Sequence, residues 1–182
     1  MVCKKNYDGY MNNAALPSKE VYTGSVRDYF YDQSRGIFDP QFDVVGPVDI
    51  NVSMTYPRQT SNMQSVIGKV IDAADDQVDF SKYDTNGDGT VDMFYVIFAG
   101  YGSNFGGNNS NYVWPHAWSV SYKYADGVRL GRYACSTELY GREGSSSYLD
   151  GIGTICHEFS HVLGLKDEYD TDYEGSGGQS VD

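Results

Sequence analysis

The chain has 182 residues, 25 of them acidic and 13 basic, which gives a formal net charge of −12 at neutral pH. This length is enough to bury the apolar core of one domain. The negative charge would repel a phosphate backbone, and no apolar run approaches the roughly 20 residues of a membrane helix, so we expect neither a nucleic-acid partner nor membrane insertion.

Two helices and a strand are predicted in the first half of the chain. Ser25 is a favourable N-cap residue, and Asp28 follows it at the spacing of a capping box, so a helix should begin here. Residues 44–52 have the composition of a strand. Apolar residues then recur at spacings of one, three and four along residues 62–76, which predicts an amphipathic helix that backs a sheet.

A central strand, a hairpin and a last helix follow. Residues 93–99 are continuously apolar and are typical of a buried central strand. Residues 112–118 and 128–135 resemble shorter strands on either side of a turn at Asp126-Gly127, so we expect a hairpin. The last helix should run from about residue 147 to 163, with Ser147 and Asp150 as a capping box and Gly164 as its stop.

The segment before the central strand has the pattern of a calcium loop. Oxygen-bearing side chains occupy positions 1, 3, 5 and 9, and Gly89 stands at the sixth position, where such a loop turns sharply. Tyr95 replaces the usual final Glu and a strand follows, so bound calcium would be structural; the alternative is an ordinary turn rich in Asp and Gly. The candidate ligands are Asp84, Asn86, Asp88, Thr90 and Asp92.

The last predicted helix carries a His-Glu-x-x-His motif, which arises by chance roughly twice in a thousand chains of this composition. His157 and His161 are four residues apart and face the same way, with Glu158 beside them as general base. Gly164 would end the helix and let Asp167 reach the same zinc ion as third ligand, leaving a fourth position for an activated water. Glu168, Asp170 or His116 could be the third ligand instead.

The sequence leaves open the role of His116 and the pairing of Cys135 and Cys156. His116 stands between Trp114 and Trp118, in a loop that could bind substrate, although a packed aromatic loop with a hydrogen-bonded His is the alternative. Three cysteines cannot all pair within one chain, and a bridge between Cys135 and Cys156 is one option.

Residues 151–170, Gly-Ile-Gly-Thr-Ile-Cys-His-Glu-Phe-Ser-His-Val-Leu-Gly-Leu-Lys-Asp-Glu-Tyr-Asp, resemble the active-site segment of the immune inhibitor A family of bacterial secreted metallopeptidases. Residues 24–30, 98–102 and 114–118 resemble the same family in its usual order. Lys166 stands where the family usually has Pro, and no Met follows the zinc motif, so the expected Met turn is absent from this sequence.

The resemblance implies an α+β zincin domain, in which a mixed twisted sheet lies between a backing helix and an active-site helix. It also implies cleavage of internal peptide bonds in protein or peptide substrates. We expect residues 1–182 to be a single catalytic domain truncated at both ends.

The leading hypothesis is a zinc endopeptidase, secreted or at the cell surface, where a structural calcium site would fill easily. His157, His161 and Asp167 would hold the zinc, and Glu158 would act as general base. Two competing hypotheses are a non-catalytic surface binding module stabilised by calcium, and an incomplete fragment of a metallopeptidase.

Overall fold

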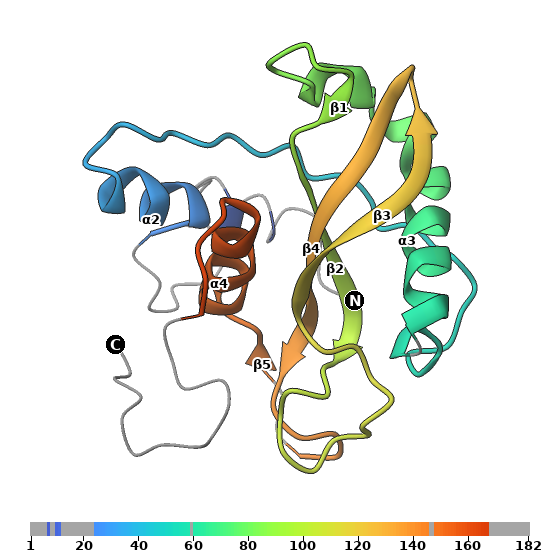
Figure 1. The fold of residues 1–182 in the computed structure, drawn as a ribbon. Helices are drawn as coiled ribbons and strands as arrows, with labels where there is room; N and C mark the ends of the chain where they lie inside the picture. The colour runs from blue at the N-terminus through green and yellow to red at the C-terminus, as the bar shows by residue number, and fades with distance from the viewer. Residues whose placement is uncertain (1–6, 8–9, 12–23, 59, 146–147, 168–182) are drawn as a thin grey trace.

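The computed structural model describes residues 7, 10–11, 24–58, 60–145 and 148–167 (Figure 1). The elements in chain order are α2 (Val26–Gln33), the 3-10 turn η1 (Tyr56–Arg58), α3 (Thr60–Ala74), the 3-10 turns η2 (Asp75–Gln77) and η3 (Phe80–Tyr83), β1 (Thr90–Val91), β2 (Phe94–Tyr101), β3 (His116–Ala125), β4 (Val128–Tyr140), β5 (Tyr148–Leu149) and α4 (Ile152–Val162).

Strand β4 lies at the centre of a mixed five-stranded sheet. Strands β1 and β2 run parallel to it, and β3 and β5 run antiparallel. The turn between β3 and β4 has positive φ at both central residues, 50° at Asp126 and 80° at Gly127, as a type I′ hairpin requires. Because β2 and β3 both pair with β4 and helices cover the sheet, residues 133–138 of β4 are all buried.

Helices α3 and α4 cover opposite faces of the sheet (Figure 1). Alternating residues of β2 show the two faces: Val96 belongs to the core cluster that contains Ile67 of α3, whereas Tyr95 and Ile97 pack against the cluster that contains Phe159 of α4. Helix α2 packs on α4. This is the predicted α+β architecture, with α3 as the backing helix and α4 as the active-site helix.

The longest predicted elements are confirmed. Helix α3 matches the predicted amphipathic helix except at residues 75–76, which lie in η2, and β2 matches the central strand from Phe94 onward. Strands β3 and β4 form the predicted hairpin with its turn at Asp126-Gly127. The hairpin strands are longer than predicted, and the first begins at His116. Pairing with β4 decides where β3 begins, and no local property of residues 112–115 reveals that pairing.

One predicted strand and one predicted helix start were wrong. Residues 44–52 form no strand, because Pro47 has no N–H to donate to a ladder and Asn51 has a left-handed φ of 51°. Helix α4 begins at Ile152, since Tyr148 and Leu149 pair with the end of β4 as β5 instead. Ser147 of the predicted capping box lies outside the described residues.

The two described cysteines do not form a bridge. Cys135 and Cys156 are both buried free thiols. Cys135 belongs to the cluster on the α3 face of the sheet and Cys156 to the cluster that contains α4. In the part of the chain that the structure describes, no helix is both long and apolar enough to cross a bilayer.

Candidate functional site

Aromatic packing around Phe159 holds helix α4 in place. Phe159 stands between the two His of the zinc motif, and its ring lies 4.8 Å from that of Phe30 in α2, centroid to centroid. The rings of Phe38 and Phe42, from the segment after α2, lie 6.4 and 5.6 Å away. The helix that carries the motif is therefore clamped by residues more than a hundred positions earlier in the chain.

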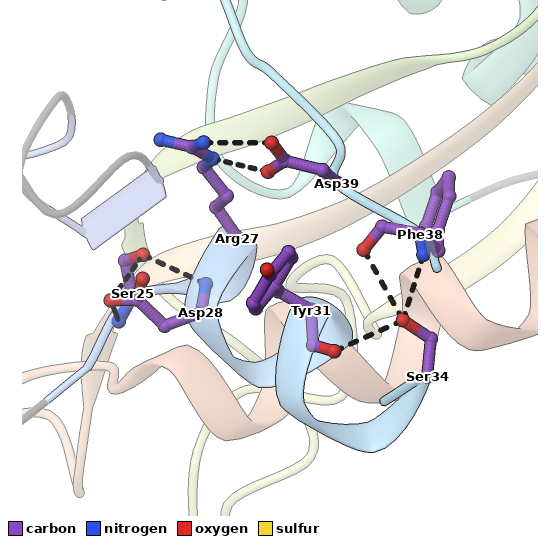
Figure 2. Close-up of polar contacts among 7 residues, drawn as sticks. All are labelled: Ser25, Arg27, Asp28, Tyr31, Ser34, Phe38 and Asp39. Carbon is purple, nitrogen blue, oxygen red and sulfur yellow. Dashed lines mark hydrogen bonds and ion pairs between the residues drawn. The ribbon is translucent and has the colours of Figure 1, made fainter. Parts of the chain in front are cut away.

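Polar contacts around α2 place these rings (Figure 2). Ser25 and Asp28 form the predicted capping box at the start of α2. Arg27 donates two hydrogen bonds to the Asp39 carboxylate, at 2.5 and 2.8 Å, and the Ser34 hydroxyl accepts the Phe38 N–H at 2.8 Å. These contacts fix the chain after α2, and with it Phe38, against α4.

Three ligand atoms converge at the end of α4. The His157 Nε2 and His161 Nε2 atoms are 3.2 Å apart, and Asp167 Oδ1 lies 3.4 Å from the first and 3.2 Å from the second. Zinc held tetrahedrally at about 2.0–2.1 Å separates neighbouring ligand atoms by about 3.3–3.4 Å. The triangle therefore has the dimensions of one face of a zinc tetrahedron, with one vertex left for water or substrate.

A hydrogen bond determines which ring nitrogen of His161 faces the candidate metal site. Its Nδ1 lies 2.9 Å from the Leu165 carbonyl oxygen, which can only accept, so Nδ1 carries a proton and, in the neutral ring, Nε2 carries the lone pair. The Nε2 atom faces the Asp167 carboxylate oxygen. Two acceptors at 3.2 Å repel each other unless a cation or a proton lies between them, so the donor set fits a metal ion.

The turn after α4 brings Asp167 to the two His. The Gly164 N–H donates to the His161 carbonyl at 3.0 Å, and the Leu165 N–H donates to the Ser160 carbonyl at 3.0 Å. This is a Schellman motif, and it needs the left-handed φ of +96° that Gly164 adopts. The predicted helix stop is confirmed.

Glu158 lies beside the three donors in a buried position. It is 6% exposed, and its carboxylate, His157 and His161 have ligand atoms within 4.8 Å of one another. Burial raises the pKa of Glu158 from 4.5 to about 7; His161 acts in the opposite direction and Asp167 adds to the rise. The His157 and His161 side chains are 48% and 23% exposed, so solvent reaches the site while Glu158 stays shielded.

His116 is not brought to this triangle. Its Nδ1 lies 2.7 Å from the Trp114 carbonyl oxygen and its Nε2 2.9 Å from the Tyr133 hydroxyl, so both ring nitrogens are engaged. It lines a pocket of about 360 Å³ between α3 and β3, together with Met63 and Trp118. Glu168 and Asp170, which the sequence also allows as third ligand, lie outside the described residues.

The predicted calcium loop is closed by its own side chains. The Asp84 carboxylate accepts hydrogen bonds from the N–H groups of Asp88 and Gly89, both at 2.9 Å. The Thr85 hydroxyl donates to Asp92. Gly89 has a φ of +80°, as the sharp turn at the sixth position requires. Within the described residues, a group of three His, Cys, Asp or Glu side chains with ligand atoms within 4.8 Å of one another is found around His157 and His161 and not in this loop.

One residue at the site was missed by the sequence analysis. The Arg132 guanidinium, from β4, donates to the His161 carbonyl at 3.2 Å. No motif includes this residue, because strand pairing and helix packing alone bring it to α4.

The fold and the site together define the catalytic domain of a metallopeptidase, built around a His-Glu-x-x-His helix. Comparison with known families agrees: the profile of the immune inhibitor A peptidase M6 catalytic domain matches residues 8–182. The chain belongs to this family.

Two curated relatives show how much of a longer protein the match covers. The chain is 37% identical over 112 residues to Immune inhibitor A of Bacillus thuringiensis subsp. alesti, a match that covers 54% of this chain and 16% of the relative. It is 30% identical over 198 residues to the Pre-pro-metalloprotease PrtV of Vibrio cholerae serotype O1, covering 89% of this chain and 21% of the relative. The chain spans about a fifth or less of the length of each.

Proposed function

We propose that residues 1–182 act as one catalytic domain that hydrolyses internal peptide bonds of protein substrates, with zinc held by His157, His161 and Asp167. The observation that carries the proposal is the triangle of donor atoms with edges of 3.2, 3.2 and 3.4 Å. Bound zinc would polarise the scissile carbonyl and lower the pKa of a water molecule to about 7.

Glu158 is proposed as the proton carrier of the reaction. In the metal-free chain, burial raises its pKa to about 7. Beside bound zinc the carboxylate would take a proton from the attacking water, and the carboxylic acid would return it to the leaving amine. His161 keeps the proton on Nδ1 through the Leu165 carbonyl, which orients its Nε2 toward the site. A non-catalytic binding module would have no use for a buried carboxylate beside three ligands.

A structural calcium ion in residues 84–92 is a second part of the proposal. The loop presents four carboxylate or amide side chains and has Gly in a left-handed conformation at its sixth position. Its last acidic residue, Asp92, lies two positions before β2 and donates its N–H to the Tyr83 carbonyl at 2.8 Å. Calcium bound there would stabilise the loop that leads into the central strand β2.

We also propose that the domain works outside the cell or at its surface. Two observations support this: the Vibrio cholerae relative is named a pre-pro-metalloprotease, and a weak calcium loop fills most easily in extracellular fluid.

Metal content and casein cleavage test the proposed activity. We expect one zinc ion per chain, cleavage by the wild type, and loss of cleavage with retained zinc in Glu158→Gln. Asp76→Asn, which removes an exposed carboxylate on η2, is the control and should leave both unchanged. Zinc-loaded Glu158→Gln that cleaves casein as fast as the wild type would contradict the role of Glu158.

A further inference from the structure

Arg132 links the central strand to the active-site helix. Its Nη2 donates to the main-chain carbonyl of His161 at 3.2 Å, across 29 positions of sequence. The Arg132 side chain is exposed, whereas residues 133–138, which follow it in β4, are all buried. The sheet therefore fixes the backbone of Arg132 while its guanidinium remains free to bind the end of α4.

The acceptor of this bond stands at a sensitive point of α4. The carbonyls of the last helical turn have no partner inside the helix, and the end of a helix carries partial negative charge. The only basic residue in that turn of α4 is His161, which is itself a proposed metal ligand. Arg132 supplies the missing positive charge from outside the helix.

The same carbonyl belongs to the turn that forms the metal site. It also accepts the Gly164 N–H at 3.0 Å, and the next residue, Leu165, accepts from the ring of His161. This turn determines that the His161 Nε2 atom and Asp167 Oδ1 lie 3.2 Å apart. Two of the three proposed ligand atoms, those of His161 and Asp167, therefore depend on the backbone that Arg132 holds.

We infer that Arg132 is a positioning residue for the metal site, which holds the C-terminal turn of α4 so that His161 and Asp167 present their ligand atoms together. The inference rests on the proposed zinc site. It differs from two simpler roles. A surface hydrogen bond without function would leave zinc affinity unchanged, and a direct substrate contact would change KM alone.

Three variants of the full chain separate these roles. Arg132→Met keeps the length of the side chain and removes its donors, and Arg132→Lys keeps the charge and a donor. Arg129→Met is the matched control, because Arg129 is also exposed on β4 and its guanidinium has no hydrogen bond or ion pair with any of the described residues. Zinc affinity is measured by competition with a chelator, and the melting temperature of the zinc-free chain and the values of kcat and KM for a peptide substrate are measured in parallel.

We expect Arg132→Met to bind zinc about tenfold more weakly than the wild type, the usual effect of losing a group that orients a ligand. At saturating zinc kcat should fall while KM stays constant. Arg132→Lys should recover most of the affinity, Arg129→Met should match the wild type, and all zinc-free chains should melt at the same temperature.

Zinc affinity of Arg132→Met within about twofold of the wild type would overturn the inference, as would an equal loss in Arg129→Met. A rise in KM alone would assign Arg132 to substrate binding instead. A lower zinc-free melting temperature in both Arg132 variants, with equal loss of affinity, would reduce its role to general stability. Zinc affinity is measured without substrate, so absence of cleavage by the zinc-loaded wild type would contradict the proposed activity and not the role of Arg132.

Discussion

The ring of Phe30 in α2 packs edge-on against the ring of Phe159 in α4, with their centroids 4.8 Å apart. Both side chains are buried, at 6% and 4% exposed. Phe159 lies between the two His of the zinc motif, so the packing of α2 affects the orientation of both proposed ligands. Figure 1 shows α2 beside α4, on the side of α4 away from the sheet.

Phe30→Ala should therefore weaken both the fold and the metal site. Removing a buried Phe ring costs about 3–5 kcal/mol, and we expect the free energy of unfolding to fall by about 3 kcal/mol, with weaker zinc binding. Denaturant unfolding and zinc titration measure the two effects. Tyr31→Ala, at a neighbouring position that is 46% exposed, is the control and should cost far less. Equal losses in the two variants would show that the packing of Phe30 on Phe159 does not support the metal site.

Gly164→Ala should destabilise the turn that brings Asp167 to the site. A side chain at a φ of +96° costs about 1–2 kcal/mol, and the turn can relieve that strain only by moving Asp167. We expect lower stability and weaker zinc affinity. Gly153→Ala is the matched control: Gly153 lies within α4 with open space around it, so Ala there should raise stability by about 0.5–1 kcal/mol. Zinc binding by Gly164→Ala that equals that of the wild type would refute the proposed role of the turn.

Asp167→Ala tests the identity of the third ligand. Losing a ligand should weaken zinc binding by more than the roughly 10–100-fold typical of an outer-shell group. Asp170→Ala probes one of the alternative third ligands, in the same acidic segment, and should retain affinity. Chelator competition gives both values. The reverse pattern, in which Asp170→Ala loses zinc and Asp167→Ala keeps it, would move the third ligand to Asp170.

Calcium should raise the melting temperature of the chain. A ligand that binds only the folded state at a hundred times its Kd stabilises that state by about 2.7 kcal/mol. Thermal melting with calcium and after chelation measures the effect, with zinc held constant. Asp84→Asn should abolish the response, because this carboxylate lies at the first position of the loop. A wild-type chain that melts at the same temperature with and without calcium would show that residues 84–92 form an ordinary turn.

Local sequence patterns were sufficient to predict several features of this protein. The spacing of His157, Glu158 and His161 depends only on helix geometry, and the stop at Gly164 depends only on backbone conformation, so both could be predicted from the sequence. The same holds for the apolar face of α3, the capping box at Ser25 and the turn at Asp126-Gly127. Each of these features is decided within a few neighbouring residues.

Contacts between distant segments were decided only by the tertiary structure. Pairing with β4 determined where β3 begins and made residues 148–149 the strand β5. The sequence of one strand does not reveal its pairing partner. His116 lies on the α3 face because of its register with Cys135. Phe30 and Arg132 contact α4 from positions far away in the chain. The sequence by itself therefore predicted the chemistry of the proposed metal site, because the proposed ligands share one helix and one turn. The residues that hold that site come together only through long-range packing.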